Sequence, residues 1–203
     1  DIRAIVIKAK TAKTPHVQGF IANIKDQAPL YDLIVASPSI GTGIDITFDD
    51  GAQLIDAVFG FFETRINTHF DIDQQLARVR NPKRINVWIS PKTYSFQTDP
   101  AVIASEIESM ESEFKKLIDI TPDGEKVYFQ DTAGAIYAKI YASVSASRRA
   151  SINNLRQNFI DLRRSNGWTV EYVKPDKELI SAGREVAKAK RAADKEKILE
   201  SIM

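Results

Sequence analysis

Residues 32–46 read DLIVASPSIGTGIDI, an apolar run followed by a turn with two glycines and then an aspartate. The run at 32–36 has the continuous apolar character of a strand that is buried on both faces of a parallel sheet. Three further apolar runs predict strands, at Ala4–Lys8, Leu54–Phe62 and Ile85–Ile89. Between the strands, two stretches have helical spacing and predict helices at His16–Lys25 and Asp71–Arg80. Strands that alternate with helices indicate an α/β fold with a mainly parallel sheet.

Length and composition narrow the class of protein. The chain has 203 residues, of which 43% are apolar, enough for one large domain or two small ones. Its 28 basic and 27 acidic residues nearly cancel, so any nucleic-acid surface must come from local clustering. Cysteine is absent, which excludes disulfides, thiolate metal sites and cysteine nucleophiles. Without a signal peptide or a membrane-length apolar run, we expect a cytoplasmic protein with no membrane contact.

The pattern changes after Ser90-Pro91. Residues 1–91 alternate strands and helices, 92–175 predict a mostly α-helical accessory region, and 176–203 predict a charged helix. Three apolar faces predict helices in the accessory region: Ile103, Ile107, Met110, Phe114 and Leu117; then Ala133, Ile136, Ile140 and Val144; then Ile152, Leu155, Phe159 and Leu162. Short runs at Val127–Gln130 and Trp168–Val173 predict strands. Because the chain opens in a strand and stops in a helical pattern, we expect both ends to be cuts in a longer protein.

The glycine-containing turn after the strand at 32–36 has the features of a phosphate-contacting loop. Ser37 and Ser39 would lie at the carboxyl edge of the sheet, where ligands of α/β folds bind. Gly41 allows close approach of the backbone, so N–H groups and hydroxyls there could hold phosphate oxygens of a nucleic acid. Asp45 could accept a hydrogen bond from a ribose or from an arginine. The alternative is an ordinary turn in which Asp45 caps a helix.

A second segment places two glutamines and two arginines in the predicted helix Asp71–Arg80. Gln74 and Arg78 are four residues apart and would share a helix face. A guanidinium is always charged and binds phosphate oxygens as a fork, which suits it to neutralise charge on a γ-phosphate. The alternative is an amphipathic helix whose arginines are solvated. No G-x-x-x-x-G-K-[ST] loop occurs, so the chain lacks the usual cradle for ATP phosphates.

Together these segments, Ser37-Pro38-Ser39-Ile40-Gly41-Thr42-Gly43-Ile44-Asp45 and Gln74-Gln75-Leu76-Ala77-Arg78-Val79-Arg80, resemble motifs V and VI of superfamily 2 helicases. With Phe59-Gly60-Phe61-Phe62 and Val87-Trp88-Ile89-Ser90-Pro91, the chain resembles plasmid and phage replication proteins of the cyanobacterial RepA type, and more distantly the herpesvirus origin-binding helicases. The resemblance covers residues 1–91 and implies the C-terminal RecA-like lobe of an ATP-dependent DNA helicase.

The resemblance also implies roles for individual residues. Arg78, Arg80 and Gln74 would act in catalysis, with one arginine as the finger on the γ-phosphate. ATP and Mg²⁺ would be shared with an N-terminal lobe, and the residues nearest the nucleotide would be Gly43, Asp45 and Gln75. Single-stranded DNA would contact the motif V residues Ser37, Ser39, Gly41 and Thr42. Primase-like or origin-binding modules would complete the polypeptide.

Two departures from the helicase pattern leave the finger unassigned. Ala77 stands where many superfamily 2 members have glycine, and Arg80 follows Arg78 by two residues rather than three. Arg78 matches best by position. Thr42 stands where some families have arginine.

Three more arginines recur every seven residues, at Arg149, Arg156 and Arg163. If one helix spans them, they form a basic stripe that could follow a phosphate backbone; the alternative is a solvated helix face. His16 and His69 have no partner at metal-ligand spacing, so we expect no metal site. The function that the sequence favours is a second motor lobe; the alternative is a degenerate lobe that serves as a non-catalytic scaffold for replication proteins.

Overall fold

The computed structural model describes residues 2–37, 44–113, 117–120, 126–128, 132–174 and 176–200. It divides into two units, Asp1–Gly167 and Trp168–Met203. The elements of the first unit, in chain order, are β1 (Ala4–Ile7), α1 (Pro15–Ala22), α2 (Ile24–Gln27), the 3-10 turn Ala28–Leu30, β2 (Leu33–Ala36), the 3-10 turn Asp49–Gly51, β3 (Val58–Phe62), α3 (His69–Leu76), β4 (Ile85–Ile89), α4 (Pro100–Glu113), β5 (Leu117–Ile120), β6 (Lys126–Tyr128), α5 (Thr132–Asn153) and α6 (Leu155–Ser165). The second unit holds α7 (Lys177–Glu200).

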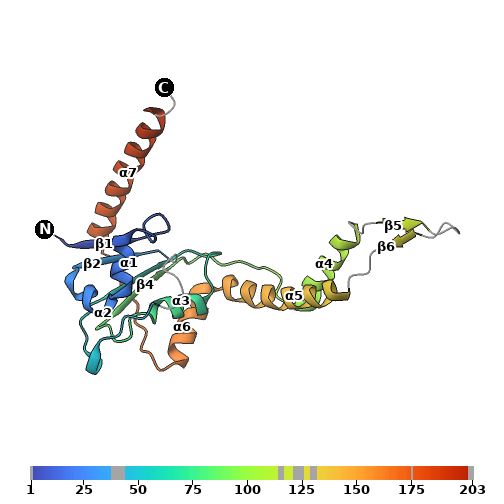
Figure 1. The fold of residues 1–203 in the computed structure, drawn as a ribbon, viewed down its shortest axis with the longest axis horizontal. Helices are drawn as coiled ribbons and strands as arrows, with labels where there is room; N and C mark the ends of the chain where they lie inside the picture. The colour runs from blue at the N-terminus through green and yellow to red at the C-terminus, as the bar shows by residue number, and fades with distance from the viewer. Residues whose placement is uncertain are drawn as a thin grey trace. The chain divides into compact units, whose positions relative to one another are not determined.

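The strands of the N-terminal part form two parallel pairs. β1 pairs with β2 from Ala4↔Leu33 onward, and β3 pairs with β4 from Val58↔Ile85 onward (Figure 1). A helix follows β1 and another follows β3, because the chain must cross back over the sheet to start a parallel neighbouring strand. The expected α/β class with parallel strands is therefore confirmed.

Each parallel pair is covered on one face. Ile5 and Ile7 of β1 are buried against Val17 and Phe20 of α1. On the other face Val6, Leu33 and Val35 are exposed. The expectation that the run at 32–36 is buried on both faces is therefore wrong for the part of the chain described, since helices pack on only one side of this pair.

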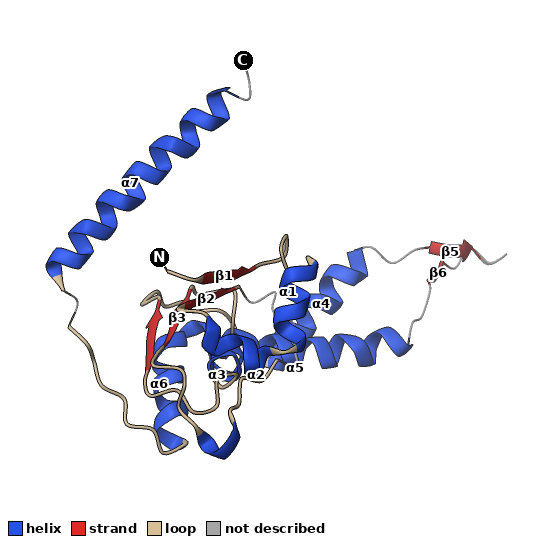
Figure 2. Cartoon of the chain, turned by 60° about the vertical axis from the view of Figure 1, so that its left-hand side comes forward, coloured by secondary structure: helices blue, strands red, loops and turns tan. Residues whose placement is uncertain are grey.

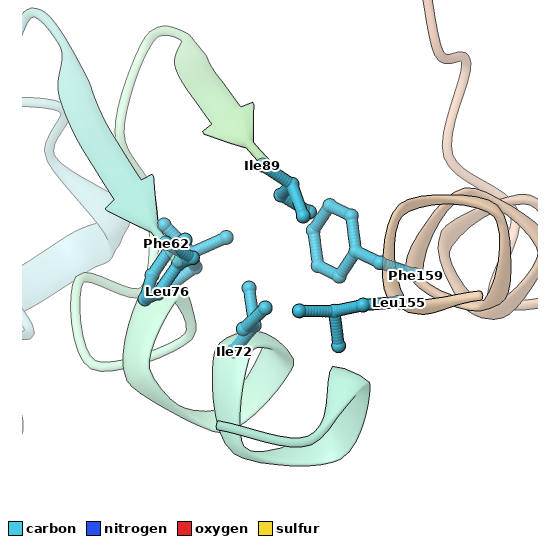
Figure 3. Packing of buried hydrophobic residues seen from close by; sticks show 6 residues of the cluster. All are labelled: Phe62, Ile72, Leu76, Ile89, Leu155 and Phe159. Atoms are coloured by element: carbon cyan, nitrogen blue, oxygen red, sulfur yellow. The ribbon is translucent and has the colours of Figure 1, made fainter. Parts of the chain in front are cut away.

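The second pair is covered by α3 and α6. Phe62 and Ile89 meet Ile72 and Leu76 of α3, and Leu155 and Phe159 of α6 close the cluster (Figure 3). A Cβ on Gly60 of β3 would come within 2.5 Å of the Phe62 ring, so a side chain here would force that buried ring to shift. On the outer face Phe59, Phe61 and Trp88 are exposed. The sequence between residues 92 and 175 thus supplies a helix to the core of the α/β part.

Helix α3 is shorter than predicted. Thr68 and Asp71 form a capping box at its start, and the helix ends at Leu76 with Ala77 as its C-cap. The sequence predicted a helix as far as Arg80. It stops earlier because the backbone around Val79 pairs with Ile46 in an isolated parallel bridge.

Helix α5 packs through alanines, not through its large apolar residues. Ala142 and Ala146 are buried against Ile103 of α4, and Ala138 lies on the same face. The helix predicted from Ala133, Ile136, Ile140 and Val144 is confirmed as α5, but Ile136, Ile140 and Val144 are exposed. Small side chains let two helices approach closely, which explains why the alanine face is the buried one.

The remaining differences concern element ends. The predicted helix from Pro100 ends at Glu113, and Leu117 lies in β5, which pairs antiparallel with β6. Residues 168–174 form no strand, although Trp168–Val173 alternates like one. The predicted charged helix is present as α7 (Figure 2). Met110 lies in α4 and Ala133 in α5, as predicted, whereas Phe114 lies outside the described residues. The domain boundaries at 91 and 175 stay predictions.

None of the helices in the described ranges combines the length and apolar character needed to cross a membrane.

Truncation of Leu155 should destabilise the fold far more than the same truncation at the surface. Leu155 is fully buried between α6 and the β3–β4 pair, so Leu155→Ala leaves a cavity and should lower the free energy of unfolding by about 2–5 kcal/mol. Leu54 is 54% exposed, so Leu54→Ala is the matched control, with an effect within about 0.5 kcal/mol. Urea titration at 25 °C measures both. Equal effects would contradict the placement of α6 in this core.

Candidate functional site

The two segments singled out in the sequence lie side by side. Ile46 N donates to the carbonyl of Arg78 at 2.7 Å, and Arg80 N donates to the carbonyl of Ile46 at 3.1 Å. These bonds form the parallel bridge between Ile46 and Val79. The backbone therefore fixes Asp45 next to the arginine segment, although 35 residues separate Asp45 and Arg80.

An ion pair joins the side chains at this place. The Nε–H of Arg80 donates to both carboxylate oxygens of Asp45, at 3.1 and 3.2 Å, and the Thr47 hydroxyl donates to Oδ1 at 2.9 Å. Hydrogen bonds from Arg80 and then Thr47 lower the pKa of Asp45, so the carboxylate is charged and oriented. Both side chains are about half exposed, at 57% for Arg80 and 47% for Asp45. A pair this exposed adds little stability, so its main effect is to position the guanidinium.

The other predicted catalytic residues lie differently. Arg78 follows the end of α3, so it does not share a helix face with Gln74, which is exposed on α3; that expectation is wrong. Arg78 is partly buried, and its carbonyl takes part in the bridge to Ile46. The side-chain amide of Gln75 in α3 donates to Asn67 Oδ1 at 3.2 Å, a local contact with the turn before the helix. Arg80, not Arg78, is the arginine beside Asp45.

The predicted phosphate loop is only partly described. The backbone N–H of Ser37 donates to the carbonyl of Ile7 at 2.9 Å, which carries the β1–β2 pairing one residue past β2. Ser39, Gly41, Thr42 and Gly43 lie outside the described residues, so their contacts stay predictions. Asp45 lies in an irregular segment and caps no helix, so the alternative given for it is wrong.

The predicted arginine stripe does not form. α5 ends at Asn153 and α6 begins at Leu155, so no single helix spans Arg149 to Arg163. Arg163 is buried, pairs with Asp73 of α3 at 2.8 Å and lies over the Phe159 ring. Burial lowers the pKa of Arg163, and Asp73 opposes that shift. Arg163 therefore fastens α6 to α3 and is not available to nucleic acid.

Arg149 and Arg156 are the two remaining members of that stripe. Arg149 is partly buried and donates to the carbonyl of Gln97 at 3.5 Å, and Arg156 is exposed on α6. They lie on different helices, so they do not form one surface by helical spacing.

The sequence patterns did not single out two residues at the ion pairs of Arg80 and Arg163, namely Thr47 and Asp73. Thr47 stands two residues after Asp45, the spacing at which a hydroxyl can reach a carboxylate, so local sequence contained that signal. Asp73 gave none, because its partner Arg163 is 90 residues away. Within the described ranges, no three histidine, aspartate or glutamate side chains gather as a metal site would need.

Comparison of the chain with protein-family models, with curated proteins and with solved structures gives no match.

The Asp45–Arg80 pair predicts a pH-dependent contribution to stability. Because the pKa of Asp45 is lowered in the folded state, the unfolded chain binds its proton at higher pH. The stabilisation is present above the ordinary carboxyl pKa of about 3.9 and is lost as pH falls through the lower, folded-state value. We expect NMR titration of the Asp45 carboxyl carbon to show this low pKa. Arg80→Ala should raise it, whereas Arg84→Ala should not, because Arg84 is exposed and is not among the groups that act on the Asp45 carboxylate. An unchanged pKa in Arg80→Ala would refute the pairing.

Proposed function

We propose that the chain is a RecA-like second motor lobe of an ATP-dependent DNA helicase or translocase involved in plasmid, phage or mobile-element replication. Two features support this proposal beyond the motif resemblance. The strands pair in parallel with helices between them, and the motif V and motif VI segments are joined by the bridge between Ile46 and Val79. Such a protein works in the cytoplasm or the interior of a host cell.

The observation that carries the proposal is the contact between Asp45 and Arg80. The Asp45 carboxylate accepts from the Nε–H of the Arg80 guanidinium, and this contact orients the Arg80 side chain. The N–H groups of the two terminal nitrogens can still donate to a ligand. Those donors suit the equatorial oxygens of a γ-phosphate, where charge develops during phosphoryl transfer. We therefore assign the finger to Arg80, with Asp45 as its positioning residue.

The rest of the mechanism follows from two lobes around one nucleotide. An N-terminal lobe with a phosphate loop binds ATP and Mg²⁺, and closure of the lobes brings Arg80 to the γ-phosphate. Residues Ser37 to Asp45 hold single-stranded DNA during closure. Opening after hydrolysis releases this grip, so each cycle moves the lobe along the strand. Primase or origin-binding modules of the same polypeptide would use that movement.

Substitution of Arg80 should strongly reduce ATP hydrolysis by the protein in which this chain is joined to an ATP-binding lobe. We expect Arg80→Ala to reduce the DNA-stimulated ATPase rate by about 10³-fold or more, because an arginine finger contributes on that scale. Arg84→Ala is the matched control, since Arg84 is an exposed arginine four residues further on. Arg78→Ala should lose less. Turnover within a few-fold of wild type in a folded Arg80→Ala protein would overturn the assignment.

A second function, a non-catalytic interaction scaffold, is favoured by one specific observation. α5 exposes a continuous apolar face opposite its alanines, formed by Ile136, Tyr137, Ile140, Tyr141 and Val144. Each of these side chains is more than half exposed, and an exposed apolar face of this size is typical of a protein-binding surface. A well-folded parent protein with no ATP turnover, with or without DNA, would favour the scaffold over the motor.

A further inference from the structure

The carboxyl ends of β3 and β4 lead into two segments that contact each other through aromatic and cationic side chains. The Tyr94 and Phe96 rings stack with their centroids 5.1 Å apart and an interplanar angle of 12°. The guanidinium carbon of Arg65 lies 5.3 Å from the Tyr94 centroid and 5.4 Å from the Phe96 centroid. The carboxyl edge of parallel strands is where α/β folds bind ligands.

This aromatic pair is held rigidly from several sides. The buried Thr64 hydroxyl lies 3.1 Å from the Tyr94 hydroxyl, in hydrogen-bond contact. The Asn153 side chain accepts from Phe96 N and donates to Phe96 O, both at 2.9 Å, and the Asn153 carbonyl accepts from Tyr94 N at 3.0 Å. Both rings remain partly exposed. The pair is therefore a fixed surface that a planar group can reach.

Arg65 adopts an unusual backbone conformation to reach these rings. Its φ is +73°, in the left-handed region that side chains other than glycine rarely occupy. Such a conformation costs free energy, so the surrounding contacts must hold it in place.

Two more arginines reach the same pair of segments from α5. Arg148 donates to the carbonyl of Ile66 at 2.9 Å, next to Arg65, and Arg149 donates to the carbonyl of Gln97, next to Phe96. In the described part of the chain none of these three arginines forms a salt bridge, whereas Arg3, Arg80 and Arg163 each pair with an aspartate. The arginines at the aromatic pair therefore keep their positive charge available to an anion.

We propose that Arg65, Tyr94, Phe96, Arg148 and Arg149 form a binding site for single-stranded nucleic acid. The arginines contact backbone phosphates, and a base stacks on the Tyr94–Phe96 pair. A basic surface with aromatic rings suits this ligand because every base has a π-face and every nucleotide a phosphate. The site is separate from the predicted motif V contacts, and it depends neither on ATP nor on the assignment of Arg80.

The charge contribution can be tested with a matched set of arginines. Fluorescence anisotropy of a labelled dT12 oligonucleotide measures binding to the full chain, without ATP, at 50 and 200 mM NaCl. We expect the triple variant Arg65→Gln, Arg148→Gln and Arg149→Gln to bind at least about 10-fold more weakly at 50 mM, with a shallower salt dependence. The triple variant Arg84→Gln, Arg156→Gln and Arg164→Gln removes the same charge at exposed positions elsewhere and should lose much less. Equal losses, or no binding by wild type, would overturn the site.

The stacking contribution needs a different comparison. Phe96→Leu keeps an apolar side chain but removes the ring, so it should weaken dT12 binding by about 5-fold or more, the scale of one stacked base. It should leave binding of an abasic 12-mer unchanged. Equal effects on both oligonucleotides would refute stacking. Thermal unfolding of each variant checks that the fold is intact, and Arg65→Gln alone provides a second test if Phe96→Leu is destabilised. Binding of dT12 is measured without ATP and the ATPase rate is measured separately, so failure of the motor assignment and failure of this site are distinguishable.

Discussion

The packing of α6 on the β3–β4 pair is the interaction on which the first unit depends. Two parallel strands cannot stand alone, because each needs helices to cover its apolar side chains. Leu155 and Phe159 complete that cover beside Ile72 and Leu76, and the buried pair of Arg163 with Asp73 fixes α6 to α3. Leaving either of these charges without its partner would be costly, which gives α6 a definite position on α3. The end of α5, which immediately precedes α6, is fixed by the same packing.

That position explains how distant parts of the sequence meet at the strand ends. Ser151 accepts from the His69 backbone at the start of α3, and Asn153 hydrogen-bonds to the backbone around Phe96. The segments that follow β3 and β4 are therefore held by the last turn of α5. In the proposed motor lobe, the residues that contact DNA would have to keep a fixed geometry, and a helix fastened to the core provides such a support. The Asp45–Arg80 contact is held independently, by backbone bonds between its own two segments.

The sequence predicted the features that depend on local pattern. The strands β1, β2 and β4 coincide with apolar runs, and Ile72 and Leu76 of α3 face inward as their spacing indicates. Predictions failed where long-range contacts decide. The large apolar residues of α5 predicted a helix, but they did not predict that its alanines form the face that packs on α4. Arg163 looked solvated because Asp73 lies far away in sequence. The residues around Arg65 gave no signal, since the two loops that bring them together are far apart in sequence.

The uncovered face of the β3–β4 pair affects how the protein behaves at high concentration. The β3 segment Val-Phe-Gly-Phe-Phe is uncharged and rich in aromatic residues, and within the described residues β3 pairs with β4 alone. Such a segment, with one backbone edge open and Phe59 and Phe61 exposed, favours strand addition between chains. A bulkier residue at Gly60 would displace the buried Phe62 ring, so it would disturb the core as well as interrupt the segment. A domain or partner that covers this face would therefore protect the chain from self-association as well as complete its core.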